Sequence, residues 1–103
     1  MLMTTTDSIA GKNLEMLGLV QGNIVRTKNI GKSIAAGFRA MGGGEVLIFT
    51  NLLKEARETA LDRMQEQAKT LGADAIVGIR ITTCSVMDGS SEVTAYGTAV
   101  KFV

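Results

Sequence analysis

The strongest constraint on this chain is a β-hairpin pattern near its C-terminal end. Two runs rich in β-branched residues, Ala75 to Met87 and Glu92 to Val103, flank the segment Asp88-Gly89-Ser90-Ser91. Asp-Gly between two alternating runs favours a tight turn, because both residues tolerate the positive φ angles that such turns need. The pattern therefore predicts two long antiparallel strands, around which the rest of the chain is organised.

The hairpin separates its side chains into two faces, because successive residues of a strand point to opposite sides. If the loop is even, the face that a helix would cover carries Ala75, Val77, Ile79, Ile81, Tyr96, Thr98, Val100 and Phe102. The other face is small and weakly polar, and it carries Ile76, Gly78, Thr82, Cys84, Val93, Ala95, Gly97 and Ala99, with Arg80 and Lys101 among them. Glycine inside a strand often marks a close approach by another backbone. We interpret the second face as a contact between subunits.

Two further strands and a first helix are expected upstream of the hairpin. Leu2 to Thr5 predicts a short edge strand, and Leu14 to Arg26 predicts a longer strand. A helix is expected from Ile30 to Met41, because Asn29 can cap its N-terminus and apolar residues recur at helical spacing.

A second, longer helix is indicated by an unbroken apolar arc. The residues of this arc are Val46, Phe49, Leu53, Ala56, Ala60, Met64 and Leu71, and Gly72 follows as a C-cap. A strand from Val46 to Thr50 followed by a helix from Asn51 remains the alternative, because this run is rich in β-forming residues. The order β-β-α-α-β-β predicts one α+β domain over residues 1–103, with two helices packed on one face of a largely antiparallel sheet.

Charge and composition exclude several classes of function. Eleven basic and ten acidic residues give a net charge of +1, and aromatic residues make up only 4%. Such a chain lacks the clustered cations and the stacking platforms of nucleic-acid-binding proteins. No apolar run reaches the ~18 residues of a membrane helix, and the start of the chain does not have the pattern of a secretory leader. We therefore expect a cytoplasmic protein that binds neither nucleic acid nor a membrane.

Several blocks of the sequence resemble one known family. They are Gly43-Gly44-Glu45, Thr50 to Arg57, Arg63-Met64, Leu71 to Arg80 and Glu92 to Val100, with Thr4-Thr5-Thr6, Gly11 and Gly18 to Asn23 fitting as well. Together they cover essentially the whole chain and resemble the YbjQ-like family of small uncharacterised bacterial proteins, which is catalogued as heavy-metal-binding. The resemblance implies an α+β subunit that assembles with itself into a ring, a pentamer, without an established activity.

A metal site cannot be completed by one copy of the chain. Zinc sites usually combine cysteine and histidine ligands, and this chain has no histidine and the single cysteine Cys84. A closed ring can bring several copies of Cys84 together, and thiolates suit soft metal ions. The other interpretation is that Cys84 is a small buried apolar residue, as most free cysteines are. Both interpretations remain open.

Five charged residues are candidates for contacts between subunits or with a ligand: Glu45, Arg57, Asp74, Arg80 and Glu92. Arg57 is the most constrained, because it falls within the apolar arc of the long helix, where a guanidinium needs a partner. Glu45 lies too far along the same helix to pair with it, but it can reach Arg57 from a neighbouring subunit. An arginine that extends from the helix edge to water, an intersubunit ion pair and an anion-binding pocket are the open alternatives.

The sequence contains no recognisable catalytic constellation. A triad would need a histidine, and neither Cys84 nor any serine has an identifiable activating base. Gly42-Gly43-Gly44 is not a phosphate-binding loop, because the acidic Glu45 follows it and no Lys-Ser/Thr pair does. We therefore expect a homo-oligomeric binding or structural protein rather than an enzyme. The alternative is a soft-metal-binding protein whose site lies between subunits.

Overall fold

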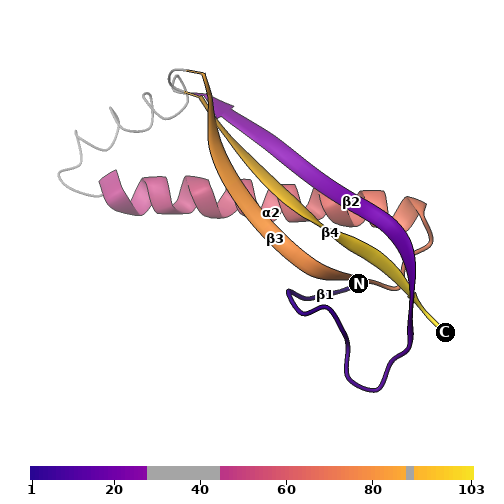
Figure 1. Ribbon diagram of the computed structural model, residues 1–103. Helices are drawn as coiled ribbons and strands as arrows, with labels where there is room; N and C mark the ends of the chain where they lie inside the picture. The colour runs from indigo at the N-terminus through magenta and orange to yellow at the C-terminus, as the bar shows by residue number, and fades with distance from the viewer. Residues whose placement is uncertain (28–44, 88–89) are drawn as a thin grey trace.

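The computed structural model describes residues 1–27, 45–87 and 90–103. The elements of these residues are β1 (Leu2–Met3), β2 (Leu14–Thr27), α2 (Glu45–Thr70), β3 (Ala75–Met87) and β4 (Ser90–Phe102). The strands form one sheet of order β1-β3-β4-β2, and α2 lies along one face of the three long strands (Figure 1). The chain is elongated, measuring 55 × 25 × 18 Å.

Strand β4 is the centre of the sheet. It pairs antiparallel with β3, from Ala75 opposite Val100 to Met87 opposite Ser90, and antiparallel with β2 along its other edge. The two strands of the predicted hairpin are therefore confirmed, and the predicted turn at Asp88-Gly89 lies outside the described residues. The sheet is mixed, because the short β1 runs parallel to β3.

The prediction of two helices in the order β-β-α-α-β-β is wrong for the described part of the chain, which contains one helix in the order β-β-α-β-β. The segment predicted as the first helix, Ile30 to Met41, lies outside that part. The long helix is confirmed, and the alternative strand from Val46 to Thr50 is wrong, because α2 runs unbroken from Glu45 to Thr70.

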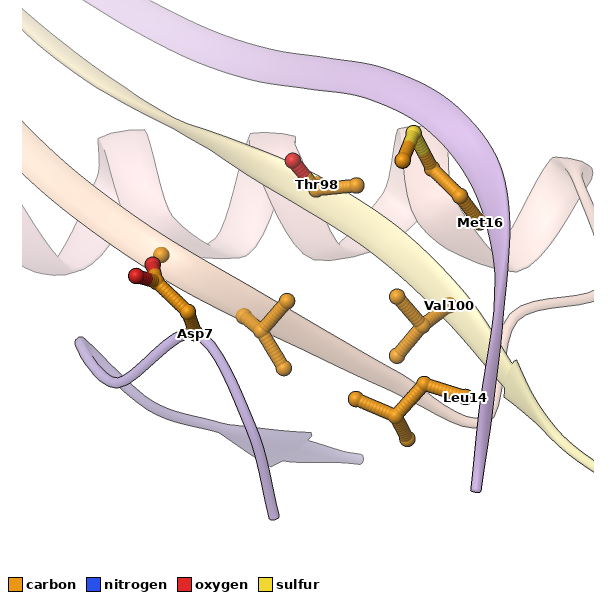
Figure 2. A pocket seen from close by; sticks show the side chains of 7 residues that line it. Asp7, Leu14, Met16, Thr98 and Val100 are labelled. Atoms are coloured by element: carbon orange, nitrogen blue, oxygen red, sulfur yellow. The ribbon is translucent and has the colours of Figure 1, made fainter. Parts of the chain in front are cut away.

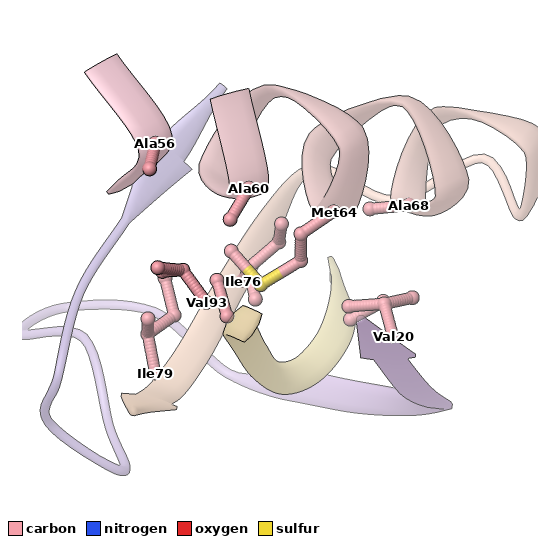
Figure 3. Packing of buried hydrophobic residues seen from close by; sticks show 10 residues of the cluster. Val20, Ala56, Ala60, Met64, Ala68, Ile76, Ile79 and Val93 are labelled. Atoms are coloured by element: carbon pink, nitrogen blue, oxygen red, sulfur yellow. The ribbon is translucent and has the colours of Figure 1, made fainter. Parts of the chain in front are cut away.

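Helix α2 covers the hairpin face that the sequence analysis assigned to a subunit contact. The buried helix residues Ala56, Ala60, Met64 and Ala68 pack against Val20, Ile76, Ile79, Val93, Ala95 and Ala99 (Figure 3). Alanine on both surfaces lets the helix axis approach the sheet closely. At Gly22 the approach is closest, since a Cβ there would overlap the carbonyl oxygen of Ala60 and the amide nitrogen of Met64. The small face is therefore an intramolecular core.

A β-bulge in β3 explains why strict alternation misassigned the faces. The pairing register shifts between Val77 and Arg80, and Gly78 takes a positive φ of 62°. Ile76 and Ile79 consequently both lie under α2, although they are an odd number of residues apart. Cys84 changes to the face away from the helix, because it pairs with Glu92, the neighbour of buried Val93. Strict alternation along β3 does not anticipate this, because Gly78 at the bulge reverses the pattern.

No helix in the described residues combines the length and the apolar character that a membrane crossing requires.

Candidate functional site

The face of the sheet away from α2, called the open face below, is the main candidate surface. At one end it is covered by the N-terminal segment, which comprises residues 4–13 between β1 and β2. There Ile9 of this segment packs against Ala75, Val77 and Val100 together with Leu14 of β2 and Phe102 of β4. Beyond that cover, four large side chains of this face are exposed: Met16 (75%), Leu19 (70%), Val25 (49%) and Tyr96 (37%). Met16, Leu19 and Val25 of β2 lie opposite Val100, Thr98 and Glu92 of β4. These β4 residues alternate with buried ones and share a face with Tyr96, so all four exposed side chains lie on the same side of the sheet. These four side chains have no cover within the described residues.

A hollow of about 270 Å³ lies in the open face beside the N-terminal segment. It is lined by Asp7, Leu14, Met16, Val77, Gly78, Thr98 and Val100. Figure 2 shows Asp7 extending from the N-terminal segment toward β3. Its Oδ1 lies 3.5 Å from the position that a Cβ of Gly78 would take, so the carboxylate stands directly at the bulge. The hollow therefore combines apolar walls with one carboxylate and one hydroxyl.

The N-terminal segment is held in place by the bulge. The amide of Gly78 donates to the carbonyl of Thr6 (2.8 Å), and the amide of Ile79 donates to the carbonyl of Thr4 (3.1 Å). Arg80, one of the predicted contact residues, donates from Nη1 to the carbonyl of Thr5 (3.0 Å). Because Arg80 fixes the segment that carries Asp7, it has a positioning role within its own chain.

Two other predicted contact residues make hydrogen bonds within the subunit. Asp74 Oδ2 accepts from the amide of Phe102 (2.8 Å), so this carboxylate ties the end of β4 to the start of β3. Glu92 is half-buried and accepts from Thr94 Oγ1 (2.8 Å). These bonds leave each carboxylate with further acceptor capacity, but the structure does not bring Asp74 and Glu92 together, since they lie near opposite ends of β3 and β4.

Arg57 is exposed, so it is not buried with Ala56 and Ala60 on the sheet-facing side of α2. Between Asn51 and Thr70, where burial is described, the buried residues of α2 are every fourth one from Ala56 to Ala68, a narrower stripe than the arc. Leu53 and Leu71, which the arc included, are each 46% exposed. Within residues 1–27, 45–87 and 90–103, Arg57 makes no hydrogen bond or ion pair. The remaining predicted contact residue, Glu45, is the first residue of α2.

Sequence reasoning missed two residues that protect the outer edge of β2. Arg63 donates from Nη1 to the carbonyl of Asn23, and Gln67 Oε1 accepts from the amide of Gln21; each of these hydrogen bonds is 2.6 Å long. Open strand edges invite pairing with other strands, and proteins commonly block them. The sequence carries one signal for them. Arg63 and Gln67 are four residues apart, and each directly precedes a buried residue of α2, Met64 and Ala68 respectively, so both lie at the border of the buried side of the helix.

The donor set for a metal ion is incomplete in one copy. Cys84 is exposed, and its cross-strand neighbour on the open face is Glu92. Nowhere in the described chain do three or more histidine, cysteine, aspartate or glutamate residues lie close enough to hold a metal ion together. A thiolate and one carboxylate do not fill the coordination shell of a soft metal. The described residues of a single subunit therefore do not fit a complete metal centre.

A solved structure shares this fold. It is the crystal structure of a protein with unknown function from Pediococcus pentosaceus, which belongs to the DUF74 family. The TM-score is 0.70, and the match covers 100% of this chain and 98% of that one at 17% sequence identity. At this identity the likeness establishes the fold alone.

The chain belongs to the YbjQ family, because that family's model, described as "Putative heavy-metal-binding", matches residues 1–103. The resemblance seen in the sequence is thereby confirmed. A UPF0145 protein of Vibrio parahaemolyticus is 54% identical, over 100% of this chain and 99% of the relative. UPF0145 proteins of Thermosipho africanus (49%, covering 98% and 94%) and Thermotoga maritima (47%, covering 98% and 96%) are also similar. None of these names states an activity.

Proposed function

We propose that this protein is a homo-oligomeric binding or structural subunit that assembles through the open face of its sheet, and that it works in the cytoplasm. The observation that carries the proposal is the row of exposed apolar side chains at Met16, Leu19, Val25 and Tyr96. Met16, Leu19 and Tyr96 are neighbours on this face, whereas Gln21 and Asn23 separate Val25 from them. Neighbouring exposed apolar side chains typically mark an interaction site, whereas single exposed apolar residues are normal.

The burial of these four side chains supplies a sizeable driving force. They are between 37% and 75% exposed, and full burial of a large apolar side chain stabilises by about 2 kcal/mol. Covering the four therefore contributes roughly 4 kcal/mol per copy before the entropy of association is subtracted.

The shape of the chain also supports assembly through the open face. The radius of gyration is 16.9 Å, whereas a compact domain of 100 residues has about 13 Å. A thin two-layer subunit has little interior of its own, and a second copy on the open face would provide a third layer. The family resemblance implies a ring of five such subunits.

Native mass spectrometry of the purified protein tests this proposal. The wild type is expected as an assembly of 10.9 kDa subunits, with five copies expected from the family resemblance. The double variant Met16→Lys/Leu19→Lys should dissociate, because two cations would have to be desolvated at the interface. Leu71→Lys is the matched control, since Leu71 is exposed at the end of α2, away from the open face. A wild type that is monomeric, or a double variant that assembles normally, would refute the proposal.

A second candidate function is the binding of a soft metal ion between subunits. It is favoured by one observation: the exposed Cys84 lies on the same open face that we propose for assembly, next to the carboxylate of Glu92. Copies of this pair that meet across an interface would supply the donors that one subunit lacks. Equilibrium dialysis with Cd²⁺ or Cu⁺ tests it. Uptake should be stoichiometric in the wild type and lost in Cys84→Ala with the assembly intact; unchanged uptake in Cys84→Ala removes this candidate.

A further inference from the structure

One flank of α2 presents an apolar stripe with a cation in its middle. Leu53, Arg57 and Leu61 follow one another at intervals of four and therefore line one side of the helix. Leu53 is 46% exposed, and Leu61 is half-buried beside a second hollow of about 310 Å³, which Met3, Thr4, Thr5, Ile79 and Ile81 also line. The flank is accessible because α2 packs mainly on β2 and β4 and hardly on β3.

Arg57 is the cation of this stripe, and the described residues offer it no partner. A guanidinium on a long apolar stem suits a site with apolar walls and a carboxylate, where the stem packs and the planar head pairs with the two carboxylate oxygens. The hollow of the open face is such a site. Its walls are Leu14, Met16, Val77 and Val100, and its carboxylate, Asp7, has no ion pair within the described chain.

The stripe on α2 and the hollow of the open face cannot both be covered in a dimer of two copies. The stripe lies with α2 on one side of the sheet, and the hollow lies on the other side (Figures 1 and 2). A copy whose stripe contacts its neighbour's hollow still has its own hollow free for a further copy. This head-to-tail contact repeats from copy to copy, and it closes into a ring when the rotation between neighbours permits.

We propose that Arg57 of one copy enters the hollow of the next and pairs there with Asp7, while Leu53 and Leu61 lie against the open face. This inference rests on the proposed function, because it names the two surfaces that meet in the assembly. It explains in one contact why an exposed arginine on an apolar stripe and a carboxylate in an apolar hollow both lack partners within the described subunit.

A charge exchange tests the pairing. Arg57→Asp and Asp7→Arg should each raise the dissociation constant of the assembly at least about tenfold, because each places like charges together in a desolvated contact. The double variant Arg57→Asp/Asp7→Arg restores opposite charges and should return the constant to within about threefold of the wild type. Asp62→Arg is the control, since Asp62 is exposed on a different side of α2, and it should leave the constant unchanged.

Sedimentation velocity over a concentration series gives the constants, and circular dichroism verifies that each variant is folded. If the single variants assemble like the wild type, or the double variant stays as weak as the single ones, the pairing of Arg57 with Asp7 is refuted while assembly through the open face stands. If the wild type itself is monomeric, both proposals fall. Mixing Arg57→Asp with Asp7→Arg adds a further check: every contact between unlike copies then joins opposite charges, so the mixed sample should form assemblies in which the two variants alternate, and their absence would contradict the pairing.

Discussion

Replacement of Gly22 by alanine should be among the most destabilising small changes in this chain. Gly22 lies in β2 directly beneath α2, where a Cβ would overlap the carbonyl oxygen of Ala60 and the amide nitrogen of Met64 and would stand 2.8 Å from the carbonyl carbon of Arg63. All three atoms belong to the helix backbone, so no side-chain rotation can relieve the overlap. The helix must move away from β2 as a unit.

The cost of that movement can be estimated from what it disrupts. Overpacking of a well-packed core costs about 1–3 kcal/mol. The hydrogen bonds of Arg63 and Gln67 to the edge of β2 would lengthen at the same time, and each such bond contributes about 1 kcal/mol. We therefore expect Gly22→Ala to lower the free energy of unfolding by about 3–5 kcal/mol. At about 4 °C or more per kcal/mol for a domain of this size, Tm falls by at least about 12 °C.

Thermal unfolding followed by circular dichroism, at one fixed subunit concentration, measures this effect. Gly11→Ala is the matched control, because Gly11 has a positive φ of 76° but no heavy atom within 4 Å of the added Cβ. It should cost only the roughly 1–2 kcal/mol of the left-handed conformation. If Gly22→Ala lowers Tm no more than Gly11→Ala does, the close approach of α2 to β2 is refuted.

Three further changes test other parts of the fold. Gly78→Ala should lower stability by roughly 1–2 kcal/mol, because φ is 62° at the bulge, and limited proteolysis should then cut the N-terminal segment faster; unchanged cleavage would contradict its dependence on the bulge. Arg63→Ala combined with Gln67→Ala should cost about 2 kcal/mol and should promote aggregation by opening the edge of β2, which light scattering on heating detects. Asp74→Ala removes the acceptor of the Phe102 amide, so hydrogen exchange at that amide should accelerate at least about tenfold, as the loss of about 1.4 kcal/mol implies; an unchanged rate argues against this bond.

The long strands and the long helix could be predicted because their patterns are continuous. No glycine or proline interrupts the apolar period of α2, and the two strands of the hairpin alternate over many residues. The face that the helix covers could not be predicted by alternation, because one bulged glycine, Gly78, exchanges the faces of β3. The face that α2 covers is also the one with the smaller side chains, since α2 packs by close approach of Ala56 and Ala60 to Ala95 and Ala99.

The candidate site was only partly visible in the sequence. Arg57, Arg80 and Glu92 were singled out by charge and spacing, and the structure assigns Arg80 to the anchoring of the N-terminal segment. Asp7 carries no signal in the sequence, because its position beside Gly78 depends on the backbone hydrogen bonds of Thr4 and Thr6 with β3. Such a contact between residues far apart in the chain leaves no periodic signal.

Sedimentation equilibrium of the wild type across the micromolar range tests the central claim most directly, namely that other copies of this chain cover the open face. The account predicts a single assembly whose mass is a multiple of 10.9 kDa and which dissociates when Met16 and Leu19 are replaced by lysine. A 10.9 kDa species that persists at high micromolar concentration would contradict it.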